Sequence, residues 1–192
     1  MIIVTKVGVE EMTKKSKCEF DEYVCDILEN KYFLETKKDL HHGTSKYEHS
    51  LRVAKLSYKL GKFFKADLRS VSRAGILHDF FFGTRKENPE NSYLRHPVIA
   101  SNNAQKYFNV TELEREAIKT HMFHHVLIKK IFPFVNRKEK ATIKEFKPKS
   151  KEGWIICLSD LIVSIGECER FQFTYAFNVA VLLVFNIILF KN

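Results

Sequence analysis

The chain has 192 residues, of which 45% are hydrophobic, and this length and apolar content suffice for one domain with its own core. Its formal net charge of +9 favours polyanionic partners such as nucleotides, nucleic acid or acidic lipid, although a solvated basic surface is the simpler alternative. The four cysteines lack the paired spacing of zinc sites, and Gly, Pro and strand-like alternation are scarce, which indicates an all-α fold.

The first predicted element is a helix that follows a short arm. Residues 1–17 have no helical periodicity and are predicted to form a flexible N-terminal arm. Residues 18–38 are predicted to form an amphipathic helix, because their apolar side chains recur at helical spacing. This helix opens a helical domain that we place at residues 18–170, ahead of a hydrophobic tail at residues 171–190.

Two helices with N-terminal capping signals follow. Residues 45–48 have the Ser-x-x-Glu spacing of a capping box, and the helix that they open carries His49 on its apolar face. Asp67 can cap the third helix, which ends in His78 and Asp79 after a run of small and apolar residues. An imidazole and a carboxylate at the end of an apolar stripe need a partner, because burying an unpaired charge is costly.

The next two helices each contribute a histidine. After a surface loop at residues 83–93, His96 and Pro97 begin a helix with proline in its first turn. A second capping box, at residues 111–114, begins the helix after it. His121 follows on the apolar face of that helix, so it is also predicted to point inward.

The last predicted helix of the domain carries a carboxylate on its apolar side. The preceding connector, residues 137–151, contains seven Lys or Arg residues and is predicted to be an exposed loop. The helix itself is placed at residues 154–169, where Asp160 and Glu167 align on a largely apolar stripe. Asp160 therefore needs a partner for the same reason as the carboxylate of the third helix.

The two ends of the chain bear on its location. Residues 1–4 form too short an apolar run for a signal peptide, so reduced thiols in a cytoplasmic protein are expected. Residues 171–190 contain no charged residue and would span about 30 Å as a helix, the thickness of a bilayer core. This tail is a candidate transmembrane anchor, and a terminal helix packed on the domain is the alternative, which its three side-chain amides favour.

Six polar residues occupy inward or helix-entry positions on five predicted helices. A single inward histidine is more often a core residue bonded to the backbone than a ligand. A set of imidazoles and carboxylates without thiolate suits iron or manganese, and magnesium less well. One catalytic ion needs fewer ligands than this, whereas two ions with a bridging carboxylate would use all six. The candidate ligands are His49, His78, Asp79, His96, His121 and Asp160, while His41, His42, His124 and His125 are expected at helix flanks or on the surface.

Two motifs and one later carboxylate resemble a known family. Tyr47–Val53 and Ala74–Asp79, followed by Asp160, are similar to the ordered His…His-Asp…Asp signature of the HD-domain metal-dependent phosphohydrolase superfamily. Arg95–Pro97 and Lys119–His121 resemble the two intervening histidines of its binuclear members, which include cyclic-dinucleotide phosphodiesterases and diadenosine tetraphosphate hydrolases. The Gly-Tyr-Pro signature of the cyclic-dinucleotide branch is absent from the sequence.

The resemblance implies a helical bundle with one or two divalent ions. The first ion would bind His49, His78, Asp79 and Asp160. The second would bind His96 and His121, with Asp79 as the bridge. Many relatives carry a lysine three residues after the motif aspartate, where this chain has Phe82.

The expected activity is hydrolysis of a phosphoester or phosphoanhydride, in a nucleotide or other phosphorylated small molecule, by metal-activated water. His78 and Asp79 would be the catalytic centre of this reaction. Arg52, one turn beyond His49, is the candidate phosphate contact, with a surface salt bridge as its alternative, and Arg95 is a second candidate. The sequence contains no Gly-rich phosphate loop and no specific nucleic-acid motif.

Three other functions stay open from the sequence. The chain could be a catalytically silent HD-fold module that binds metal or nucleotide as a sensor. It could instead be a membrane-docked interaction protein that uses the basic connector and the tail. Related di-iron HD scaffolds also carry out oxygenase chemistry, so a metal site alone does not establish hydrolysis.

Overall fold

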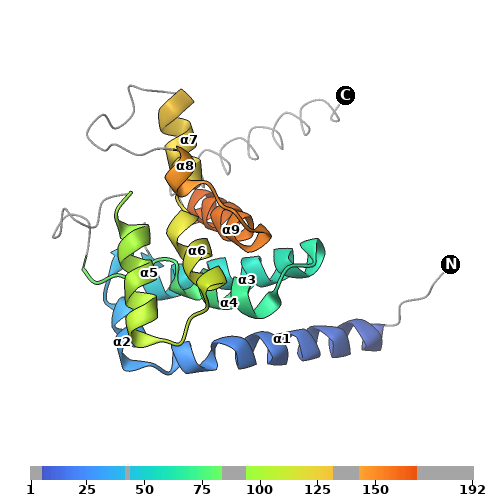
Figure 1. Cartoon of the computed structure of the whole chain (residues 1–192). Helices are drawn as coiled ribbons and strands as arrows, with labels where there is room; N and C mark the ends of the chain where they lie inside the picture. The colour runs from blue at the N-terminus through green and yellow to red at the C-terminus, as the bar shows by residue number, and fades with distance from the viewer. Residues whose placement is uncertain (1–5, 42–43, 84–93, 132–142, 168–192) are drawn as a thin grey trace, which may run out of the picture.

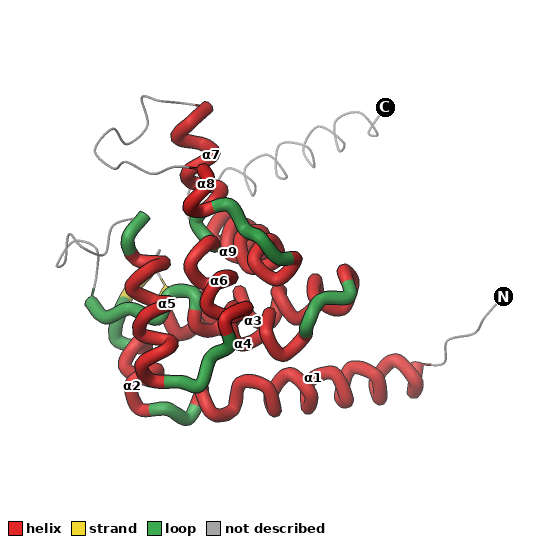
Figure 2. Tube along the Cα trace, viewed as in Figure 1, coloured by secondary structure: helices red, strands yellow, loops and turns green. Residues whose placement is uncertain are grey.

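The protein is described here by a computed structural model, which covers residues 6–41, 44–83, 94–131 and 143–167. The tube in Figure 2 is helical over most of this length, so the predicted all-α fold is confirmed. A short 3-10 turn, Glu35–Lys37, and one antiparallel pairing of two-residue strands, β1 (Leu40–His41) and β2 (Thr44–Ser45), are the exceptions among the described residues. The helices are α1 (Lys6–Leu28), α2 (Lys31–Leu34), α3 (Lys46–Phe64), α4 (Leu68–Leu77), α5 (His96–Tyr107), α6 (Glu112–Thr120), α7 (Phe123–Ile131), α8 (Ile143–Phe146) and α9 (Lys151–Glu167).

The N-terminal helix differs from its prediction at both ends. α1 begins at Lys6, so the expectation of a flexible arm was wrong for residues 6–17. Those residues lack an apolar stripe, which is the sign of a helix that periodicity detects. The predicted helix at residues 18–38 is interrupted after Leu28, because Asn30 caps the new helix α2 through its side-chain oxygen.

The capping signals were predicted correctly because they are local. Ser45 and Asp67 each accept a hydrogen bond from the backbone N–H three residues on, at 3.2 and 2.6 Å. Thr111 and Glu114 form the full reciprocal capping box, with bonds of 3.2 and 2.7 Å. These caps fix where α3, α4 and α6 begin. The start of each helix in turn determines which of its later residues face the interior.

The basic connector is only partly the exposed loop that the sequence predicted. Ile143–Phe146 forms the helical turn α8, and Phe146 is buried, so that expectation was wrong for this turn. The last helix begins at Lys151, three residues before its predicted start. Residues 137–142, the loop after Gly83 up to Tyr93 and the tail at 171–190 lie outside the described residues. Within the described residues, no helix has the length and apolarity needed to span a bilayer.

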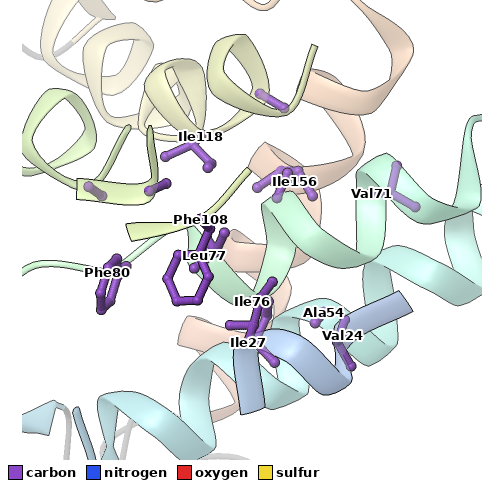
Figure 3. Packing of buried hydrophobic residues seen from close by; sticks show 14 of the residues in the cluster. Val24, Ile27, Ala54, Val71, Ile76, Leu77, Phe80, Phe108, Ile118 and Ile156 are labelled. Carbon is purple, nitrogen blue, oxygen red and sulfur yellow. The ribbon is translucent and has the colours of Figure 1, made fainter. Parts of the chain in front are cut away.

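The bundle is built around α3 and α4, which pack against each other along their length (Figure 1). α9 packs on both α3 and α4, α6 packs on α4 and α9, and α1 packs against α4. Figure 3 shows the resulting core, in which Val24 and Ile27 of α1 approach Ala54 and Ile76. This part of the core is apolar, so a polar side chain buried beside it needs a hydrogen-bond partner or a ligand.

Gly75 lets α3 and α4 come unusually close. A Cβ atom at this position would lie 2.8 Å from Cα of Ala54, a distance that real side chains do not adopt. The absence of a side chain thus brings the α3 backbone against α4. The rings of His49 on α3 and His78 after α4 consequently lie 5.2 Å apart, measured between ring centroids.

Candidate metal centre

All six candidate ligands meet at one buried point of the bundle. His49 comes from α3, His78 and Asp79 follow the last turn of α4, His96 begins α5, His121 ends α6 and Asp160 lies on α9. Their exposed fractions range from 0 to 6%. Three overlapping groups of three have ligand atoms within 4.8 Å of one another. Five helices thus place four imidazoles and two carboxylates where they could hold a metal.

Asp160 defines one side of this cluster. Its Oδ1 atom lies 3.3 Å from Nε2 of His49 and 3.7 Å from Nε2 of His78. Oδ2 of Asp79 lies 3.8 Å from the same His78 nitrogen. The space between these four residues is surrounded by two imidazole nitrogens and two carboxylate oxygens, a donor set that suits a borderline divalent ion.

Asp79 also defines the other side. Its second oxygen, Oδ1, lies 3.2 Å from Nε2 of His96 and 3.8 Å from Nε2 of His121. The two histidine nitrogens are themselves 3.0 Å apart. Oδ1 of Asp79 therefore faces His96 and His121 while Oδ2 faces His78, the arrangement expected of a carboxylate that could bridge two ions.

Two of the histidines are fixed by the same local construction. His78 and His121 each follow the end of a helix, and each Nδ1 lies 2.8 or 2.7 Å from the carbonyl oxygen three residues earlier. A carbonyl oxygen only accepts, so we assign the ring proton to Nδ1 in both residues. Nε2 then carries a lone pair and points into the cluster.

The buried Nε2 atom of His78 tests whether the cluster fits a metal. Among the described residues no atom forms a hydrogen bond with it, although it is fully buried. Buried polar atoms without a partner are rare in folded proteins. A metal ion at this point would satisfy the nitrogen, so the residues present fit a bound divalent cation.

The electrostatics of the metal-free cluster are uneven. Burial, helped by the neighbouring His78 and His96, lowers the pKa of His121 to about 3, so this ring is neutral. Burial also disfavours a charged His49, but the carboxylates of Asp160 and Glu167, which accept from its ring nitrogens when they are protonated, outweigh it and raise its pKa to about 10. Burial raises the pKa of Asp160, but the interaction with His49 lowers it by more, so the net shift is downward.

Glu167 contacts the cluster, and the sequence did not predict this contact. Its Oε2 atom lies 2.7 Å from Nδ1 of His49, and its Oε1 atom accepts a 2.6 Å bond from Arg52. Arg52, a predicted phosphate contact, is half exposed and forms this ion pair. The second such candidate, Arg95, is exposed and directly precedes His96.

Lys46 was not predicted as part of the region either. Its ammonium group donates to the carbonyl oxygens of Phe81 and Gly83 at 2.8 and 2.7 Å, and to Asp39 at 3.0 Å. The side chain is 2% exposed. Lys46 therefore ties the turn after Asp79 to the start of α3, which supports the position of that carboxylate.

The other histidines do not join the cluster, as far as the described residues show. His124 and His125 lie on α7 and are half-buried, and His124 Nδ1 is 3.7 Å from the buried Cys157 thiol. His41 lies in β1, and His42 is outside the described residues. Within the described residues, the groups able to hold a metal are thus made up of the six candidate ligands.

Comparison with known proteins identifies a family and one partial relative. Residues 47–163 match the family model described as "HD domain", a range that contains all six cluster residues. The curated protein "Ribonuclease Y 1" from Levilactobacillus brevis is 31% identical over 101 residues, which cover 45% of this chain and 19% of that protein. The chain thus spans about a fifth of that relative's length. No solved structure matches the chain significantly.

Proposed function

Because this chain belongs to the HD domain family, whose superfamily consists broadly of metal-dependent phosphohydrolases, we propose that it hydrolyses a phosphoester or phosphoanhydride in a nucleotide or similar phosphorylated molecule. One observation carries this proposal. Four imidazoles and two carboxylates converge at a buried point, and Asp79 directs one oxygen toward each half of the cluster.

The proposed cofactor is one or two divalent ions. One position would use His49, His78, Asp79 and Asp160, and the other Asp79 with the two remaining histidines, His96 and His121. Nitrogen and oxygen donors without thiolate favour iron or manganese, and magnesium prefers all-oxygen sites. We therefore propose iron or manganese as the bound metal, in one or both of these positions.

The chain's own residues prepare the reaction in three ways. The Nδ1 atoms of His78 and His121 bond backbone carbonyls, so the neutral rings present the lone pair of Nε2 to the cluster. Asp79 and Asp160 supply carboxylate oxygens that would offset the positive charge of a bound cation. Bound divalent ions would supply Lewis acidity, which lowers the pKa of water and polarises a phosphoryl oxygen. Arg52 keeps guanidinium N–H groups for a substrate phosphate, since only Nη1 is engaged with Glu167.

The relative suggests one substrate class for the first assays. A protein named a ribonuclease cleaves phosphodiester bonds of RNA, and the net charge of +9 suits a polyanion. A short oligoribonucleotide therefore belongs beside mononucleotides, dinucleotides and inorganic pyrophosphate in the substrate panel. Membrane association through the tail remains a separate proposal, which these assays do not address.

Metal analysis followed by phosphate or nucleotide release tests the proposal. Full-length protein reconstituted with Mn²⁺ or Fe²⁺ should bind up to two ions and hydrolyse at least one member of the panel. Asp79→Ala should lose both ions, since it faces both halves, whereas His121→Ala should lose mainly one. Asp21→Asn on the exposed side of α1 serves as the control and should behave as wild type.

The outcomes separate hydrolysis from simple metal binding. Activity that survives Asp79→Ala would contradict the assigned centre. Protein that binds two ions but releases nothing from any substrate would favour the catalytically silent binding module. Circular dichroism should show that the variants remain helical, so that a loss of activity is not a loss of fold.

A further inference from the structure

Glu167 lies at the end of α9, 118 residues after His49 in the chain, yet its carboxylate touches that histidine. The side chain of Glu167 is 9% exposed, so the contact is largely shielded from water. A hydrogen bond to an ionised group is among the stronger ones, and low exposure strengthens it further. The contact is therefore more than a surface ion pair.

Both oxygens of Glu167 are engaged, and this fixes the carboxylate. Oε2 meets Nδ1 of His49 at 2.7 Å, while Oε1 accepts from Arg52 at 2.6 Å. His49 and Arg52 lie three residues apart on α3, so they project from the same side of that helix. With both donors on one helix, the carboxylate has little freedom to rotate away from the imidazole.

The bond to Glu167 decides which nitrogen of His49 faces the cluster. Nδ1 is directed toward Glu167, and Nε2 lies 3.3 Å from Asp160. His78 and His121 reach the same orientation through backbone carbonyls of their own helices. A carboxylate is a stronger acceptor than a carbonyl, and it makes the opposite nitrogen a better metal donor.

We propose that Glu167, held in place by Arg52, is a positioning residue for the metal position that contains His49. It accepts the hydrogen bond of the Nδ1–H group, keeps Nε2 directed toward Asp160 and raises the affinity of that position for a divalent ion. The position that contains His96 and His121 should be unaffected, because the His121 ring bonds the carbonyl of Ile118 instead. The inference rests on the metal centre of the proposed function but not on hydrolysis.

Metal titration of the full chain tests this role. Isothermal titration calorimetry with Mn²⁺ should resolve two affinities in wild type. Glu167→Ala should weaken one of them by about 10–100-fold and leave the other within about twofold. Glu167→Gln keeps one acceptor oxygen for two donors and should fall between wild type and Ala. Glu29→Ala is the matched control. Glu29 is exposed and is not among the residues of the cluster, so this variant should bind both ions normally.

A spectroscopic readout distinguishes positioning from general stability. The visible absorption of bound Co²⁺ reports ligand geometry, so the band of one position should change in Glu167→Ala and return toward wild type in Glu167→Gln. If either folded Glu167 variant retains both affinities and the unchanged Co²⁺ spectrum, the proposal is overturned. If Glu167→Ala does not fold, the nearly isosteric Gln variant decides by the same criteria.

Failure of this role differs from failure of the proposed function. Wild-type protein that binds no ion would overturn both. Protein that binds two ions without phosphate release would contradict only the hydrolase, because the affinities and the Co²⁺ spectrum alone judge Glu167. Equal weakening of both ions in Glu167→Gln would also overturn the role, since the carboxylate touches only one position.

Discussion

Replacing Gly75 by alanine should disturb the metal centre from within the α3–α4 contact. A Cβ atom there would lie 2.8 Å from Cα of Ala54 and 3.2 Å from Oγ of Ser57. Ordinary contact begins at 3.4 Å, so the helices must separate locally by about 0.6 Å (3.4 minus 2.8). The obstacle is backbone, which cannot rotate away as a side chain could.

The expected effect is a balance of two opposing terms. Overpacking a tight core costs about 1–3 kcal/mol. Alanine in a helix is favoured over glycine by about 1 kcal/mol, which offsets part of this cost. We therefore expect Gly75→Ala to lower the free energy of unfolding by up to about 2 kcal/mol. For a chain of this size that corresponds to a fall in Tm of up to roughly 8 °C.

Gly166→Ala is the matched control for this prediction. A Cβ atom at Gly166 would meet nothing within 4 Å, so only the helical preference of alanine acts and the variant should be slightly stabilised. Urea unfolding of the metal-free proteins, followed by circular dichroism, measures both changes. The metal affinity of Gly75→Ala should fall as well, because His49 and His78 lie on the two separated segments. Equal stability of the two variants would refute the steric reasoning.

Three further predictions concern features outside the ligand set. Lys46→Met should destabilise the fold by about 2–4 kcal/mol in urea unfolding, because buried carbonyls lose their donor, and a change below 1 kcal/mol would contradict the buried network. Thr111→Ala should cost about 1 kcal/mol through loss of the capping box, and an unchanged unfolding midpoint would argue against it. Burial raises the pKa of Cys157 to about 11 from an ordinary 9.0, so its thiolate is scarce at pH 8 and grows as the pH approaches 11. Peptide mapping after iodoacetamide treatment at pH 8 should therefore find Cys25, which is exposed, labelled long before Cys157 in folded protein, and equal labelling would contradict the burial.

Sequence reasoning succeeded where the determining interactions are local. The caps at Asp67 and Thr111 act over three residues, so a short pattern contains everything that determines them. The six clustered residues stand out in the sequence because each is a polar side chain at an inward or helix-entry position. Helical periodicity predicts the direction in which a side chain points. Side chains that point inward from several helices of one bundle enter the same interior.

The sequence could not predict contacts that join distant parts of the chain. Lys46 resembles any solvated lysine next to a capping serine, and only the turn that follows Asp79 makes it buried. Glu167 carried a weak signal, since it lies two turns after Asp160 on the same stripe. That spacing places it on the inner side of α9, but its partner is fixed by how α9 packs on α3.

The way each histidine ring is held bears on the order in which the centre can assemble. His78 and His121 take their Nδ1 bonds within a single helical turn, so their orientation needs no distant segment. His49 acquires its orientation only when α9 is docked, because α9 carries both Glu167 and Asp160. An ion at this position would bind the docked arrangement and not the undocked one, and so would stabilise docking by mass action. A bound ion would then hold α9 in its docked position, and the rate at which α9 undocks would set the dissociation rate of the ion.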